Sequence, residues 1–246
     1  MSEKRPVIIE ARGLKRYYQR GIETVKALDG VDVDIREGEM VSVLGPSGAG
    51  KTTLINLLSC LDAPSGGTLT VAGKSVSGLS EDQLVDVRRG TLGFVFQKFY
   101  LLPTLTVAEN VELPLTFLRQ PVDRARTMEA LRQVGLENRA SHLPRELSGG
   151  QMQRVAVARA LMVKPKVLIA DEPTGNLDKA TGEAIFALFR ELVEVKGLTV
   201  IVTTHNLSLG YLADRVITLE DGKIVKEERT AVRASASFKT ENVLQA

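Results

Sequence analysis

The sequence predicts an α/β protein in which a helical lobe is inserted into a core of parallel strands. Three short apolar runs, Met40–Leu44, Val167–Ala170 and Thr199–Val202, are suited to buried strands. A glycine-rich loop follows the first run directly, and the pattern then changes to helical segments punctuated by prolines. A chain of 246 residues, 43% of them hydrophobic, is long enough for one such domain.

The part of the chain before the lobe is expected to supply most of the strands. Val7–Ala11 and Val31–Ile35 are typical of strands, and the second alternates apolar with acidic residues, so one of its faces should be solvated. Met40–Leu44 runs into the glycine-rich loop, and a helix is expected over Lys51–Leu61. Two further strands are expected over Thr68–Val71 and Thr91–Phe96.

The helical lobe is expected to cover about residues 98–163. Its helices are predicted over Ala108–Leu118, Arg124–Val134 and Gln151–Val163. A helix over Gly182–Lys196 follows, and then a hairpin at Asp221-Gly222 that joins Val216–Leu219 to Lys223–Val225. We expect one domain over residues 7–229 and a flexible tail over residues 230–246.

The bulk composition excludes several classes of protein. The formal net charge is +2, so no overall field would attract nucleic acid, and no nucleic-acid partner is expected. Cys60 is the only cysteine, which excludes an internal disulfide; we expect it in the core, within the helical stretch Leu54–Leu61. No apolar run approaches the ~20 residues that span a bilayer. The chain is therefore expected to be soluble and to reach a membrane only through a partner.

The glycine-rich loop matches the complete G-x-x-x-x-G-K-[ST] pattern of a phosphate-binding loop. Its residues are Gly45, Pro46, Ser47, Gly48, Ala49, Gly50, Lys51 and Thr52, followed by Thr53. Glycines let backbone N–H groups point at phosphate oxygens, and the positive end of the next helix faces the same anion. Lys51 adds a charge for the β- and γ-phosphates, and the Thr52 hydroxyl can hold Mg²⁺. Alone, the loop predicts nucleotide phosphate binding, as in GTPases, kinases and helicases; a turn that binds nothing is the alternative.

Polar residues that follow other predicted strands are candidates for the chemistry. Asp171 and Glu172 follow a buried strand at its carboxyl end, where open parallel sheets bind ligands. Asp171 is placed to hold Mg²⁺, and Glu172 to orient and activate the attacking water. The amide oxygen of Gln97 suits Mg²⁺ or that water, and His205 could donate to the γ-phosphate or steady Glu172. The alternatives are an acidic loop start and a structural histidine.

A second motif, Leu147-Ser148-Gly149-Gly150-Gln151, opens the predicted helix Gln151–Val163. Ser148 is a favoured N-cap residue, and the glycines expose backbone N–H groups at the positive end of a helix. A simple capping box needs no glycine pair, because glycine weakens a helix start. The motif therefore indicates a second anion site at which something approaches the backbone closely.

The order of these motifs resembles that of ABC ATPases, over nearly the whole chain from about Val7 to Arg229. The Leu147–Gln151 motif is similar to the family signature, and the phosphate loop, Gln97, signature, Asp171-Glu172 and His205 follow in the family's order. The resemblance implies a P-loop NTPase (RecA-like) core sheet with an antiparallel β subdomain and an inserted α-helical subdomain. It also implies a homodimer that forms head to tail on ATP binding, with each ATP between the phosphate loop of one copy and the signature of the other.

The resemblance also assigns roles to individual residues. Asp178 would lie in the D-loop at the dimer interface, and an aromatic residue before the phosphate loop would stack on adenine, for which the register favours Tyr18 over Tyr17. The residues that would contact the partner's ATP are Ser148, Gly149, Gly150 and Gln151. The implied cofactors are ATP and Mg²⁺, with the metal held by Thr52, Gln97 and Asp171 and catalysis by Glu172, His205 and Gln97.

Segments around Gln97 and Glu172 narrow the resemblance. Glu172–Asp178, Phe99–Pro103 and Glu109–Val111 are similar to the group of lipoprotein-releasing (LolD), macrolide-exporting (MacB) and bacitracin-type peptide-resistance ATPases. This implies an ATP-hydrolysing subunit, cytoplasmic and peripheral on the inner face of the cell membrane. It would power an integral-membrane permease of the LolCE/MacB/FtsX-like type. The apolar segment Lys98–Leu102 would receive a cytoplasmic helix of that permease, or else pack between the lobes.

Competing classes fit the sequence less well. The main alternative is an ABC ATPase with a non-transport role. In DNA repair or chromosome structure it would need coiled coils or zinc modules between the motifs, and in translation it would carry two cassettes. A P-loop kinase or GTPase would not need the Leu147–Gln151 signature.

Overall fold

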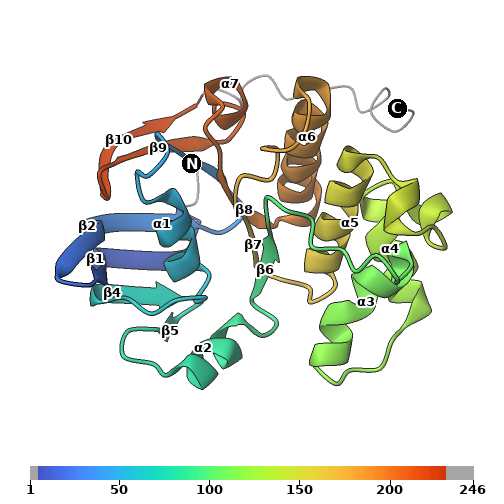
Figure 1. Ribbon diagram of the computed structural model, residues 1–246, viewed down its shortest axis with the longest axis horizontal. Coiled ribbons are helices and arrows are strands. Elements are labelled where there is room, and N and C mark those ends of the chain that lie inside the picture. Colours follow the sequence, from blue (N-terminus) through green and yellow to red (C-terminus); the bar gives the residue numbers. More distant parts are fainter. Residues whose placement is uncertain (1–4, 231–246) are drawn as a thin grey trace.

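The expected parallel strands lie at the centre of the molecule in a computed structural model, which describes residues 5–230 (Figure 1). They form a six-stranded sheet of order β10-β9-β3-β8-β7-β6, in which only β10 is antiparallel to its neighbour. The strands are β3 (Met40–Leu44), β6 (Leu92–Val95), β7 (Val167–Ala170), β8 (Thr199–Thr203), β9 (Arg215–Glu220) and β10 (Lys223–Arg229). Strands β3, β7 and β8 are buried over their whole length, as their largely apolar sequences predict, and their polar residues Ser42, Thr199 and Thr203 are buried as well.

A second sheet is antiparallel and has the order β2-β1-β4-β5. Its strands are β1 (Val7–Arg20), β2 (Glu23–Arg36), β4 (Gly66–Val71) and β5 (Lys74–Ser75). The predicted bounds Val7–Ala11 and Val31–Ile35 are wrong, because β1 and β2 each run for 14 residues and pair as far as Arg20 and Glu23. Most of the added residues are not buried, and the two that are, Leu14 and Leu28, do not form the apolar alternation that marks a strand.

The helices lie mainly in the lobe between β6 and β7 and beside the central sheet (Figure 1). They are α1 (Lys51–Leu58), α2 (Glu81–Arg88), α3 (Val107–Phe117), α4 (Arg124–Gln133), α5 (Gly149–Leu161), α6 (Lys179–Lys196) and α7 (Leu207–Gly210), with 3₁₀ turns at Glu137–Arg139 and Pro144–Glu146. The two sheets and the inserted helices agree with the predicted fold class.

Helix α1 is shorter than predicted and leaves Cys60 outside it. The helix ends at Leu58, and Cys60 has a left-handed φ of 56°. The expected core position is nevertheless correct, since the side chain is fully buried. Burial raises the pKa of the Cys60 thiol to about 12, so it stays protonated near neutral pH.

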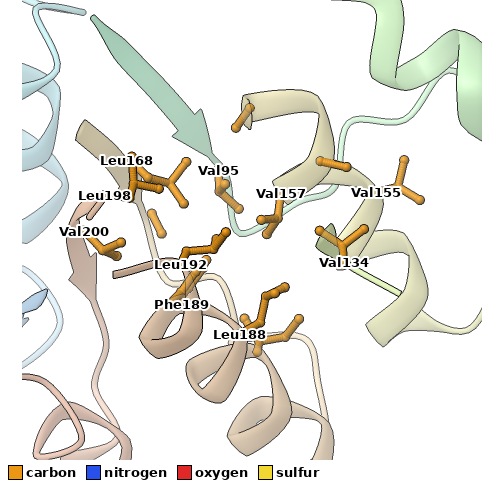
Figure 2. Packing of buried hydrophobic residues seen from close by; sticks show 14 of the residues in the cluster. Val95, Val134, Val155, Val157, Leu168, Leu188, Phe189, Leu192, Leu198 and Val200 are labelled. Carbon is orange, nitrogen blue, oxygen red and sulfur yellow. The ribbon is translucent and has the colours of Figure 1, made fainter. Parts of the chain in front are cut away.

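Apolar side chains fill both faces of the central sheet. On one face, residues of β6, β7 and β8 pack against α5 and α6; Val95, Val157, Leu168, Phe189 and Val200 are among those in Figure 2. On the other face, a second cluster joins the sheet to α1 and to the antiparallel sheet. The strands that lead to the candidate site are therefore held from both sides.

The described residues end just after β10. Arg229 is its last residue and pairs with Arg215, and the N–H of Thr230 donates to the carbonyl of Asp214 at 3.0 Å. The rest of the tail predicted over residues 230–246 lies outside the described residues. Within residues 5–230, no helix has both the length and the apolar character that crossing a bilayer requires.

Asn110 provides a test of how the lobe is held together. Its buried side chain accepts from the N–H of Leu102 and donates to the carbonyls of Leu102, Leu105 and Thr106 at 2.8–3.1 Å. Asn110→Ala should lower the free energy of unfolding by about 2–3 kcal/mol, because buried polar groups lose their partners. Denaturant unfolding would measure it, with exposed Asn138→Ala as the matched control. Equal stability of the two variants would contradict this role.

Candidate active site

Strand β3 delivers the phosphate loop at its carboxyl end, and α1 begins directly after the loop. Gly45 has a φ of 154°, and a Cβ there would lie 2.2 Å from the carbonyl oxygen of Leu219. Gly50 has a φ of 100°, and a Cβ there would lie 2.5 Å from the carbonyl oxygen of Ala27. Both positions therefore require glycine. Gly48 also has a positive φ but faces open space. The first turn of α1 has no side-chain cap and no acidic residue, which suits an anion at this helix end.

Lys51 directs its charge into the loop. The side chain is only 6% exposed, and its ammonium donates to the carbonyls of Gly45 at 2.9 Å and Pro46 at 3.0 Å. The ammonium also lies 3.6 Å from Oε1 of Glu172. A buried cation beside a curled backbone and an uncapped helix start fits the phosphates of a nucleotide.

Asp171 and Glu172 directly follow β7, at the same sheet edge as the phosphate loop; one strand, β8, lies between β7 and β3. Oδ1 of Asp171 accepts from the hydroxyl of Thr203 at 2.7 Å, and the N–H of Glu172 donates to that hydroxyl at 2.8 Å. Glu172 has a φ of 44°, in the left-handed region that residues other than glycine rarely adopt. Such backbone conformations occur at functional sites, where the surrounding structure maintains them.

The carboxylate of Glu172, which follows β7, lies near side chains from the segments after β3 and β8. Its Oε1 faces Lys51, and its Oε2 lies 3.5 Å from Nδ1 of His205, which follows β8. The carboxylate is 26% exposed and the imidazole 65% exposed, so solvent reaches this side of the site. The structure thus brings together Lys51, Asp171, Glu172 and His205, which the sequence predicted to meet at one sheet edge.

Gln97 contacts the segment that follows the acidic pair. Strand β6 ends at Val95, so Gln97 lies beyond the strand and not directly at the end that was predicted. The side-chain amide of Asn176 donates to the Gln97 carbonyl at 3.1 Å, and a Cβ on Gly175 would lie 2.7 Å from Nε2 of Gln97. The Gln97 side chain therefore packs closely against the backbone at Gly175.

Asp178 caps helix α6. Its Oδ1 accepts from the N–H of Thr181 at 3.0 Å, and its Oδ2 accepts from the Thr181 hydroxyl at 2.6 Å. These hydrogen bonds hold the pKa of Asp178 below its usual range. The predicted D-loop residue thus has a structural role within its own chain.

The second motif forms a complete capping box. Oγ of Ser148 accepts from the N–H of Gln151 at 3.3 Å, and Oε1 of Gln151 accepts from the N–H of Ser148 at 3.0 Å. The glycines are closely packed, since a Cβ on Gly150 would lie 2.4 Å from Cγ2 of Thr181, and one on Gly149 would lie 3.3 Å from Leu177. The sequence predicted that some group approaches the backbone of this motif closely, and one such group is Thr181 of α6 in the same chain.

The phosphate loop and the second motif open helices, α1 and α5, that lie on opposite sides of strands β7 and β8 in Figure 1. Around the two glycines of the second motif, Phe99 and Leu177 lie closest to position 149, and Thr181 lies closest to position 150.

Tyr17 and Tyr18 both lie on β1. The Tyr18 hydroxyl donates to Asp62 at 3.0 Å, and the guanidinium of Arg16 lies 4.7 Å from the Tyr18 ring centroid. The Tyr17 hydroxyl donates to Asp29, and this hydrogen bond raises the pKa of Tyr17. The preference for Tyr18 in adenine stacking stays a prediction.

A groove of about 570 Å³ lies between the helical lobe and α2. Its lining includes aromatic and aliphatic residues and the arginines Arg88, Arg89 and Arg159. Within the predicted docking segment, Tyr100 and Leu102 line the groove, whereas Leu101 packs against the core. Leu101 therefore agrees with the packing alternative, whereas docking at Tyr100 and Leu102 stays a prediction.

Two contributors were missed from the sequence. Helix α2, which carries two of the groove arginines, begins with a capping box of Ser80 and Gln83, and that spacing was the available signal. Thr203 was left outside the predicted strand Thr199–Val202. A hydroxyl at the end of a strand that neighbours the acidic pair would have been the signal for it.

The three side chains predicted to hold Mg²⁺ all carry oxygen atoms that can bind a metal. Among residues 5–230, no group of three His, Cys, Asp or Glu side chains is arranged to hold a metal ion. Thr52, Gln97 and Asp171 offer a hydroxyl, an amide and a carboxylate oxygen, and Mg²⁺ prefers oxygen ligands that include substrate phosphates. These donor types suit Mg²⁺, and a site built from the three residues stays a prediction.

Comparisons with known proteins agree with this geometry. A family model described as ABC transporter matches residues 28–175. MJ0796 of Methanocaldococcus jannaschii, an uncharacterized ABC transporter ATP-binding protein, is 44% identical over 228 residues, which cover 90% of this chain and 97% of that protein. The macrolide export ATP-binding/permease protein MacB of Rhodopseudomonas palustris is 46% identical over 229 residues, covering 92% of this chain but only 35% of MacB.

A solved structure is similar in fold as well as in sequence. The dimeric structure of a post-hydrolysis state of the ATP-binding cassette MJ0796, bound to ADP and Pi, superposes with a TM-score of 0.82 at 43% identity. The match covers 90% of this chain and 98% of that chain. The predicted P-loop NTPase fold is confirmed by this likeness.

The packing of Gly150 against Thr181 predicts a pair of compensating substitutions. Gly150→Ala should lower the free energy of unfolding by about 1–3 kcal/mol, because its Cβ would overlap the stiff, branched side chain of Thr181. Adding Thr181→Ser removes the methyl group but keeps the hydroxyl that bonds to Asp178, and should restore most of the loss.

Denaturant unfolding measures both effects. Gly149→Ala is the matched control, since its Cβ would meet the flexible end of Leu177 at 3.3 Å and make an ordinary contact with Phe99 at 3.9 Å. A loss of stability that Thr181→Ser did not reduce would show that the overlap is not its cause.

Proposed function

The chain belongs to the ABC transporter family of ATP-binding proteins, and from this premise we propose that it hydrolyses ATP to drive a membrane permease. Its similarity to MJ0796 and MacB over most of its length agrees with the LolD/MacB group. The observation that carries the proposal is the junction of Lys51, Glu172 and His205 at one sheet edge. A non-transport role is not favoured, because these named relatives are transporter proteins.

The proposal extends to a homodimer in which two sites form between two copies. MJ0796 forms a dimer with ADP and Pi bound, which supports the same assembly here. In this arrangement the phosphate loop of one copy and Ser148, Gly149, Gly150 and Gln151 of the other contact one ATP, and Asp178 lies at the interface. The separation of the two motifs within the chain supports the assignment (Figure 1).

Each residue of the loop and the acidic pair has a part in the proposed hydrolysis. Gly45–Thr53 bind the phosphates through backbone N–H groups and the ammonium of Lys51, and Tyr18 stacks on adenine. Mg²⁺, held by Thr52, Gln97 and Asp171, would supply positive charge to the β- and γ-phosphate oxygens.

The carboxylate of Glu172 accepts a proton from the attacking water and orients it, with Gln97 assisting, and His205 stabilises charge on the γ-phosphate. This constellation positions groups and neutralises charge, which is how phosphoryl transfer is catalysed.

The permease is proposed to dock a cytoplasmic helix in the groove that Tyr100 and Leu102 line. Supporting features are the apolar lining and the exposure of these side chains, 61% and 47%. MacB, by its name, joins an ATP-binding part to a permease, and this chain spans about a third of it. The chain would then lie in the cytoplasm against the inner face of the membrane. The transported substrate would be set by the permease.

Glu172→Gln tests the catalytic assignment. The variant should bind ATP but hydrolyse it about 10²–10³-fold more slowly, because the amide cannot accept the proton of the attacking water. ATP-bound dimers should accumulate and be visible by size-exclusion chromatography. Glu183→Gln changes an exposed carboxylate on α6 and serves as the control. Turnover of the Glu172→Gln variant at the wild-type rate would refute the assignment.

Leu102→Asp tests the docking groove. The charge should reduce permease-stimulated ATPase activity at least about tenfold, because burying an unpaired carboxylate in an apolar contact is costly. The basal activity of the purified chain should not change. Val225→Asp places the same charge at another exposed apolar position, 54% exposed on β10, and should have no effect. Full stimulation of the Leu102→Asp variant by the permease would exclude docking at this groove.

A further inference from the structure

Thr203 lies between the two loops of the site but has no part in the reaction proposed above. It is the last residue of β8, and its side chain is fully buried. Strand β8 lies between β3, which leads into the phosphate loop, and β7, which leads to the acidic pair. Thr203 pairs with Val43 of β3, and the ladder to β7 ends one residue earlier, at Val202 and Ala170. The side chain of Thr203 therefore reaches the first residues after β7.

A single hydroxyl contacts both residues of the acidic pair. Thr203 donates its proton to Oδ1 of Asp171 at 2.7 Å, which fixes the direction in which the oxygen lone pairs point. One of those lone pairs accepts from the N–H of Glu172 at 2.8 Å. The hydroxyl thus holds the side chain of Asp171 and the backbone of Glu172 in one hydrogen-bonded unit.

The bond to Glu172 is made where the backbone most needs support. At a φ of 44°, Glu172 adopts a conformation that costs on the order of 1–2 kcal/mol for a residue with a Cβ. The direction of the Glu172 side chain, and so its approach to Lys51 and His205, follows from this backbone conformation. Without the hydroxyl, the N–H of Glu172 would lose its partner and the strained conformation would lose that support.

We propose that Thr203 is a positioning residue for ATP hydrolysis, which acts through Glu172 and Asp171 and does not touch the substrate. The inference rests on the proposed function of those two residues. Because the hydroxyl sets where the carboxylate of Glu172 lies, its loss should slow turnover and leave the binding of nucleotide to the phosphate loop unchanged.

The same strand offers a matched control for a purely structural role. Thr199, at the other end of β8, is also buried, at 1% exposure, and its hydroxyl oxygen accepts from the N–H of Gly38 at 3.0 Å. Thr→Val at either position removes a buried hydroxyl and leaves a backbone N–H without its partner. Both variants should lose stability, the one at position 203 somewhat more because its hydroxyl makes two hydrogen bonds, but only position 203 lies beside the acidic pair.

The experiment compares Thr203→Val, Thr203→Ser and Thr199→Val in the full chain. For each variant it measures the ATPase rate, the affinity for a fluorescent ATP analogue and the thermal unfolding midpoint. Thr203→Val should lower kcat at least about tenfold, with nucleotide affinity within about twofold of wild type. Thr203→Ser keeps the hydroxyl and should restore most of kcat. Thr199→Val should lower the unfolding midpoint but leave kcat unchanged.

The outcomes separate this inference from the function on which it rests. Wild-type kcat in Thr203→Val, or a loss of kcat that Thr203→Ser does not restore, would overturn the role of Thr203. If Thr199→Val lost as much kcat as Thr203→Val, the loss would be explained by lower stability alone, and the positioning role of Thr203 would be overturned as well. If Thr203→Val did not fold, Thr203→Ala would test the same hydroxyl with less crowding. Wild-type turnover in Glu172→Gln would instead refute the catalytic assignment itself.

Discussion

The shared carboxyl edge of three adjacent parallel strands is the constraint on which the candidate site depends. Strands β3, β8 and β7 are neighbours in the sheet although the chain between β3 and β7 contains the whole helical lobe. Parallel neighbours end on the same side, so the loops after them converge. The phosphate loop, His205 and the acidic pair meet for this reason. Lys51 joins two of these loops directly, because its ammonium contacts loop carbonyls and Glu172 together.

The sequence predicted best what burial and backbone geometry dictate most strictly. The bounds of β3 and β7 agree with the predicted runs residue for residue, because strands buried on both faces are mostly apolar; Ser42 is the one polar residue among them. The glycines of the phosphate loop could likewise be recognised, because Gly45 and Gly50 have no room for a Cβ. The resemblance to ABC ATPases is confirmed by the family match over residues 28–175.

Other features depend on contacts that no local pattern records. The outer halves of β1 and β2 are mainly polar apart from the buried Leu14 and Leu28, and their extended form follows from pairing with each other. Thr203 could not be recognised as a partner of Glu172 without the order of strands in the sheet. The close fit at Gly150 was expected from the glycine pair, but its partner within the chain, Thr181, comes from the packing of α5 against α6. Sequence reasoning thus identified candidate residues that lie together at one sheet edge, and missed a side chain that bonds to two of them.

Helix α5 connects the groove to the second motif through a continuous set of contacts. Arg159, on this helix, donates to the carbonyls of Phe99 at 2.7 Å and Tyr100 at 2.6 Å, and so fixes the segment that lines the groove. The same helix begins at the Ser148 capping box, where Gly150 packs on Thr181. Thr181 in turn bonds to Asp178. A permease helix bound in the groove would therefore contact α5, the helix that in the proposed dimer places the second motif against the partner copy. Helix α5 would therefore link the proposed docking groove to the proposed nucleotide contact of the second motif. The phosphate loop and the acidic pair do not line the groove and so make no such link.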